Sequence, residues 1–80
     1  MINKQPMSLY EAHKQGSFQV ASVPHMPLLK NLGLRPGTHI TVQHRYSLGG
    51  PVVLRVEGAY DLALGKDIAR KVTVVEAIPA

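Results

Sequence analysis

The stretch from Pro27 to Val42 constrains the fold more than any other part of the sequence. It begins as a short helix, since Pro27 suits the first helical position, where its missing N–H would have no intrahelical partner. Leucines at 28, 29 and 32 give this helix one apolar face, and Gly33 suits the left-handed position just past a helix end. A helix this short is unstable alone, because marginal helices in water need roughly 12–15 residues. We therefore expect this segment, here called the plug helix, to pack on the rest of the chain.

A tight turn and a strand follow the plug helix. Pro36 presets φ at the second position of a type II turn over residues 35–38, and Gly37 supplies the positive φ at the third. From Thr38 onward apolar and polar residues alternate, with Ile40 and Val42 on the same face. This period of two predicts a strand over residues 38–46.

Four other segments have the composition of short strands: residues 18–23, 52–57, 60–64 and 70–76. Ser8 and Glu11 match a capping box, which predicts a helical turn over residues 9–14 with Leu9 and Ala12 facing inward. Five antiparallel strands separated by Gly and Pro indicate an all-β (mainly β) fold, which closes most economically into a small barrel with the leucines of the plug helix over one end. The strand residues expected inside are Phe18, Val20, Ile40, Val42, Val52, Leu54, Val56, Leu62, Leu64, Val72 and Val74.

Eighty residues make one small domain. We expect residues 1–7 to be a flexible N-terminal segment, residues 8–76 the barrel domain and residues 77–80 a tail. The absence of cysteine excludes disulfides and thiolate metal sites. No apolar run approaches the roughly 20 residues of a membrane-spanning helix, and the first six residues lack the pattern of a signal peptide. These features predict a soluble cytoplasmic protein.

Charge and the aromatic residues leave the kind of partner open. The net charge of +4 favours an acidic protein surface, a membrane surface or nucleic acid, although the basic residues are scattered. A nucleic-acid platform needs exposed rings among basic residues. We expect Phe18 and Tyr60 in the core and Tyr10 and Tyr46 at the barrel ends, so a solvated basic surface is the favoured interpretation.

The sequence does not predict an enzyme, a cofactor or a metal site. The five carboxylates are scattered, and no serine or cysteine lies in a nucleophile motif. His39 and His44 are five residues apart on one predicted strand, so an undistorted strand points them to opposite faces. His13 and His25 fall on a predicted helix end and a loop, without ligand spacing.

The order of the motifs resembles that of the FeoA family, small proteins of bacterial ferrous iron uptake. The segment Leu28–Gly37 is similar to the family pattern L-x-x-L-G-L-x-P-G, and further matches continue to about residue 76. The positions that match as structural motifs are Leu32, Gly33, Leu34, Pro36, Gly37, Gly50, Pro51 and Gly58. Many members have a basic run before this pattern, where this chain has Pro24–Pro27, so contacts of that run do not carry over.

The resemblance implies an SH3-like barrel that acts on the cytoplasmic GTP-binding domain of the membrane transporter FeoB and modulates Fe(II) transport. It implies contact with the membrane only indirectly, through the transporter, and no nucleic-acid partner is expected. The residues expected to meet this partner are Leu28, Lys30, Asn31, Arg35 and Leu48. The leucines of the plug helix are also candidates for a purely structural role. Alternatives are a basic barrel that binds nucleic acid, and an interaction or regulatory domain akin to that of iron-dependent repressors. Self-association, by strand edges or by the plug helix, is a further hypothesis.

Overall fold

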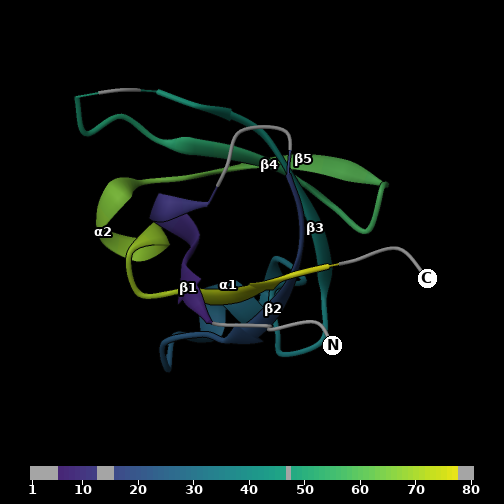
Figure 1. The fold of residues 1–80 in the computed structure, drawn as a ribbon. Coiled ribbons are helices and arrows are strands. Elements are labelled where there is room, and N and C mark those ends of the chain that lie inside the picture. Colours follow the sequence, from purple (N-terminus) through teal and green to yellow (C-terminus); the bar gives the residue numbers. More distant parts are fainter. Residues whose placement is uncertain (1–5, 13–15, 47, 78–80) are drawn as a thin grey trace.

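A computed structural model describes residues 6–12, 16–46 and 48–77 of the chain. Within them one antiparallel sheet, in the order β1-β6-β2-β3-β4-β5, curls around the core (Figure 1). The strands are β1 Met7–Ser8, β2 Ser17–Ser22, β3 His39–Arg45, β4 Val52–Val56, β5 Tyr60–Leu64 and β6 Thr73–Glu76. Three short helices join them, η1 Leu9–Glu11, α1 Pro27–Asn31 and α2 Lys66–Ala69. The predicted mainly-β antiparallel fold is confirmed.

The structure adds one strand to the five that the sequence predicts. Met7 and Ser8 form β1 and pair with Val74 and Thr73 of β6. Two residues are too few for an alternating pattern, so this strand is recognisable only from its pairing with a distant segment. Residues 1–5 of the predicted N-terminal segment and 78–80 of the predicted tail lie outside the described residues.

The core matches the predicted strand faces closely. Ten of the eleven strand residues expected inside are buried, and Leu62 is partly buried against them. Leu9 and Ala12 are also buried, and the Ser8 hydroxyl accepts the Tyr10 N–H at 3.1 Å as the N-cap of η1. The helical turn is shorter than expected, because the backbone is already extended at Ala12; residues 13–15 are not among those described.

The plug helix is α1, and it ends as the sequence predicts. Gly33 has a φ of +89°. Its N–H donates to the Lys30 carbonyl at 3.0 Å, and the Leu34 N–H donates to the Leu29 carbonyl at 2.9 Å. These two bonds form a Schellman motif, which satisfies carbonyls at the helix end. Leu29 and Leu34 are both fully buried, so the two ends of this motif lie in the core.

Tyr60 corrects a sequence prediction. It was expected in the core, but 44% of its surface is exposed. Tyr60 begins β5, the last strand of the sheet, and its hydroxyl donates to the Leu32 carbonyl at the end of the plug helix. An edge strand has a neighbour on one side only. The ring therefore borders the core and holds the plug helix through its polar tip.

Candidate interaction surfaces

The turn after the plug helix is held by one buried side chain. The Thr38 N–H donates to the Arg35 carbonyl at 3.0 Å, and Gly37 has a φ of +96°, which confirms the predicted turn. The Thr38 hydroxyl donates to the Gly33 carbonyl at 3.0 Å and accepts the Arg35 N–H at 3.2 Å. This hydroxyl joins the plug helix to the start of β3, so the position of the helix is fixed.

Four of the five predicted contact residues are exposed on this unit. Leu28, Lys30, Asn31 and Arg35 are exposed, and 55% of the Leu28 surface is accessible. We call these four residues the plug surface. The leucines predicted on one apolar face therefore differ in burial: Leu29 is buried in the core, Leu32 is partly buried and Leu28 is exposed.

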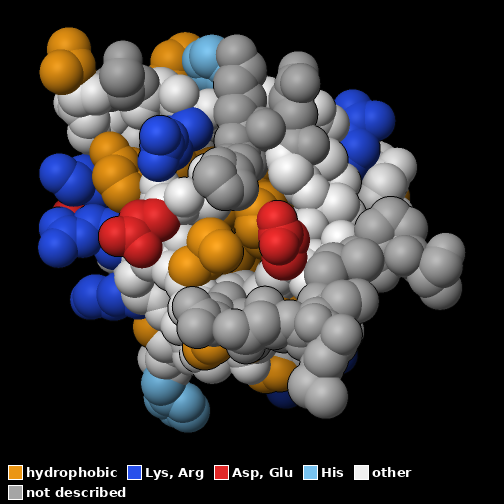
Figure 2. All heavy atoms as spheres, in the orientation of Figure 1, with side chains coloured by type: hydrophobic (Ala, Val, Ile, Leu, Met, Phe, Trp, Pro, Cys, Tyr) orange, Lys and Arg blue, Asp and Glu red, His pale blue; other side chains and the backbone are white. Residues whose placement is uncertain are grey.

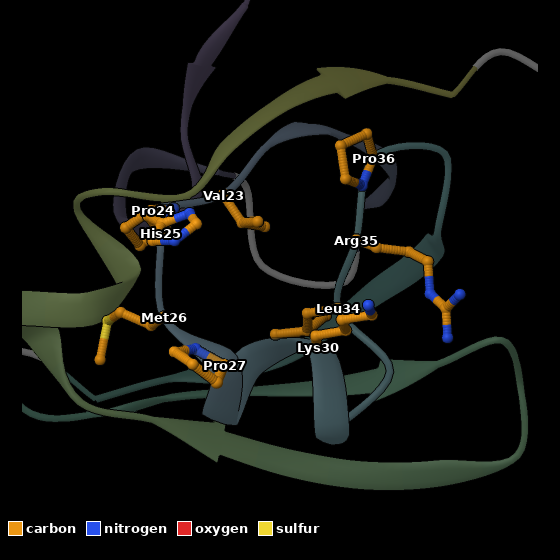
Figure 3. Close-up of a pocket in the computed structure, with 9 residues that line it drawn as sticks. All are labelled: Val23, Pro24, His25, Met26, Pro27, Lys30, Leu34, Arg35 and Pro36. Carbon is orange, nitrogen blue, oxygen red and sulfur yellow. The ribbon is translucent and has the colours of Figure 1, made fainter.

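A groove of about 470 Å³ adjoins the plug surface (Figure 3). One wall is the loop from Val23 to Pro27, and the other is formed by residues 34–36. Lys30 and Arg35 belong to both the groove and the plug surface. Sequence reasoning missed the groove, because its walls come from segments that only the fold brings together. Its lining combines proline and methionine side chains with the cations of Lys30 and Arg35.

Leu48, the fifth predicted contact residue, does not join the plug surface. The plug helix meets Tyr60 at the start of β5, whereas Leu48 lies in the β3–β4 loop, beside the other end of the β4–β5 hairpin. The β3–β4 loop and the turn between β4 and β5 lie at opposite ends of these strands (Figure 1). Leu48 is fully exposed and has a φ of +61°. Such a conformation costs a residue other than glycine about 1–3 kcal/mol.

Basic residues gather near Leu48, which the scattered sequence positions did not reveal. The Arg45 guanidinium carbon and the Lys66 ammonium nitrogen each lie 5.8 Å from the centroid of the Tyr10 ring. Arg45 also donates to the Tyr10 carbonyl at 2.7 Å. The segment from Lys66 leads directly to Arg70 and Lys71, both exposed. Residues distant in sequence therefore form one basic region around η1 and α2.

The histidine positions correct another expectation. A register shift between Val42 and His44 interrupts β3. Beyond it His44 pairs with Val53, whereas Thr41 pairs with Arg55. Directly paired residues share a face of the sheet, as do residues two apart on a strand, so His39 and His44 lie on the same outer face. Among the described residues, no three His, Asp or Glu side chains gather as metal ligands.

One salt bridge lies on the outer face of the sheet. Arg55 Nε donates to Asp61 Oδ1 at 2.9 Å across the β4–β5 pair. This hydrogen bond and the charge of Asp61 raise the pKa of Arg55. Both side chains are about half exposed, so solvent screens the pair and it contributes little to stability.

Comparison with known proteins identifies the family. The family model of the FeoA domain matches residues 7–76. The chain belongs to the FeoA family. This confirms the resemblance seen in the sequence and makes the chain an SH3-like domain of the small accessory type that is related to iron transport. A comparison with curated proteins found no match.

Solved structures agree with this assignment. A crystal structure of an iron uptake regulatory protein (FeoA) is 27% identical, with a TM-score of 0.81 over 91% of this chain and 99% of that chain. A solution structure of FeoA from Chlorobium tepidum is 28% identical, with a TM-score of 0.78 over 90% and 71%. A manganese-dependent transcriptional repressor has a TM-score of 0.82 over 96% of this chain and 45% of its own, at 16% identity, and shares the fold alone. In the described part of this chain, no helix has the length and apolar character needed to cross a membrane.

Proposed function

We propose that this chain is a cytoplasmic accessory protein of ferrous iron uptake, which docks on the GTP-binding domain of a FeoB-type transporter and modulates Fe(II) transport. Membership of the FeoA family supports a role in ferrous iron uptake. The observation that supports docking is the exposure of Leu28 on a helix whose neighbouring leucine, Leu29, is buried in the core. Polar and charged residues of the same segment, Lys30, Asn31 and Arg35, are exposed as well, and apolar residues together with arginine are typical of protein–protein contacts.

The chemistry of the plug surface defines the contact. Leu28 supplies an exposed apolar side chain, and Lys30 and Arg35 supply positive charge where the segment meets the groove. A matching surface on the transporter domain is an apolar depression with carboxylates at its rim. The rigid Schellman end and the Thr38 hydroxyl hold this surface in one conformation, so binding costs little ordering of the backbone.

The test is a calorimetric titration of the full chain against the isolated cytoplasmic domain of FeoB, with GDP and with a non-hydrolysable GTP analogue. We expect binding in at least one nucleotide state. Leu28→Ser should weaken it about fivefold or more, since truncation of an important contact residue costs over about 1 kcal/mol. Leu48→Asn is the matched control, because it removes another exposed leucine at the opposite end of the hairpin. Absence of binding in both nucleotide states would exclude direct docking. Equal losses of affinity in the two variants would exclude the plug surface as the contact.

A further inference from the structure

The end of the molecule opposite the plug surface combines an exposed leucine with a basic region. We call it the basic end and define it by Leu48, Arg45, Lys66, Arg70 and Lys71. The Lys66 side chain reaches the β3–β4 loop, since its Cδ lies 3.7 Å from the position of a β-carbon on Gly49. Figure 2 shows Lys and Arg side chains gathered over α2, on the side of the molecule where Figure 1 places the β3–β4 loop.

Leu48 violates two local preferences at once. It is an exposed large apolar side chain, and it occupies the left-handed region of φ, which branched and bulky residues avoid. Glycine or asparagine would suit the same position better. Because Leu48 does not pack in the core, the strain is not compensated by burial within the described structure. Strained positions of this kind are concentrated at functional sites.

The cations of the basic end are arranged around one aromatic residue. Arg45 and Lys66 both lie at the Tyr10 ring. The Arg70 N–H donates to the Lys66 carbonyl at 2.9 Å, so these two residues are one helical turn apart and share a side of α2. The carboxylates on the elements that pack here are Glu11 of η1 and Asp67 of α2. Four cations against two carboxylates leave a positive surface beside Leu48.

We propose that the basic end binds the surface of an anionic phospholipid bilayer, with Leu48 inserted among the headgroups and the four cations against the lipid phosphates. Basic side chains beside an exposed apolar residue are the combination that peripheral proteins use, since charge attracts the protein and apolar burial retains it. The proposal does not depend on docking to FeoB, because it concerns a different surface and a partner that contains no protein.

Nucleic acid fits the basic end less well than a bilayer does. Sequence-tolerant binding of single strands relies on rings that are free to stack on bases. The Tyr10 ring is partly buried, and the cations of Arg45 and Lys66 already lie against it. Leu48 is fully exposed; phosphate backbones offer it no apolar contact, whereas a bilayer does.

The test is co-sedimentation of the full chain with vesicles of phosphatidylcholine, alone or with a minority of phosphatidylglycerol. We expect binding only to the anionic vesicles, and a loss of binding as salt concentration rises. Lys66→Gln together with Arg70→Gln should weaken partitioning about 25-fold, because each cation near an anionic surface contributes about fivefold. Leu48→Asn should weaken it about tenfold through the lost apolar burial.

The charge-matched control is Lys30→Gln together with Arg35→Gln on the plug surface. It removes the same charge from the opposite end, so we expect binding to the anionic vesicles within about twofold of the unmodified chain, because screening limits charge effects to about 10 Å. Melting temperatures verify folding, and Leu48→Asn should melt no lower than the unmodified chain.

Three outcomes would overturn the proposal. The first is absence of binding to anionic vesicles at low salt. The second is equal loss in the two charge variants, which would mean that net charge alone attracts the protein. The third is tighter binding to a single-stranded oligonucleotide that displaces the protein from vesicles and is insensitive to Leu48→Asn.

Discussion

Gly33→Ala tests how the plug helix is held to the sheet. Gly33 has a φ of +89°, and a β-carbon added there would overlap the Tyr60 hydroxyl oxygen while lying 3.7 Å from its Cζ. The same hydroxyl donates to the Leu32 carbonyl. The substitution therefore combines an unfavourable backbone conformation with displacement of the hydroxyl from its acceptor.

The two effects have separate magnitudes. Alanine in the left-handed region costs about 1–2 kcal/mol, and a hydrogen bond contributes about 0.5–1.5 kcal/mol net. Gly33→Ala should thus reduce the free energy of unfolding by about 2–3 kcal/mol. In a domain of this size that corresponds to a fall in the melting temperature of about 10–20 °C.

A double-mutant cycle with Tyr60→Phe separates the effects, with chemical denaturation as the assay. Tyr60→Phe alone should cost about 1 kcal/mol through its lost hydrogen bond. In the Gly33→Ala background it should cost almost nothing, because the displaced hydroxyl no longer reaches Leu32. If Tyr60→Phe costs the same in both backgrounds, the hydroxyl does not hold the plug helix in the way described.

Further predictions concern the same unit and its surroundings. Gly37→Ala should cost only about 1–2 kcal/mol, because a β-carbon there meets nothing within 4 Å; its melting temperature should exceed that of Gly33→Ala. Thr38→Val should cost about 1–3 kcal/mol in denaturant unfolding, since it leaves the buried bonds to the plug helix unmade. Leu29→Ala, at a fully buried position, should cost about 2–5 kcal/mol and abolish folding near physiological temperature. Arg55→Gln should leave the pH profile of stability unchanged between neutrality and pH 10, because the raised pKa of Arg55 means that its contribution is lost only at much higher pH.

The plug helix and its turn were predictable from sequence because their determinants are local. Pro27, Gly33, Pro36 and Gly37 each specify a backbone conformation irrespective of what packs around them. The structure has a helix, a left-handed residue and a turn at those positions. Strand faces were predictable for the same reason, since a period of two is read from neighbouring residues.

Features that depend on distant segments were not predictable in this way. β1 exists because β6 pairs with it. The shift in β3 is invisible in the alternation of Ile40 and Val42, yet it reverses the face expected for His44. The groove, the exposure of Tyr60 and the basic end all depend on which segments meet in the fold. The sequence therefore predicted which helix and loop residues are exposed. It did not predict that Leu48 lies on a different surface from Leu28, Lys30, Asn31 and Arg35.

The separation of the two surfaces determines how both proposals fit one molecule. Strands of five residues are about 17 Å long, and the β4–β5 hairpin lies between Leu48 and the end of the plug helix. A protein partner on the plug surface consequently leaves the basic end open to a bilayer. Because the hairpin is part of one hydrogen-bonded sheet, the two ends keep a fixed relative orientation. The accessory domain would then hold its partner at a defined height above the membrane. Substitutions on the plug surface and on the basic end should therefore disable the two contacts independently.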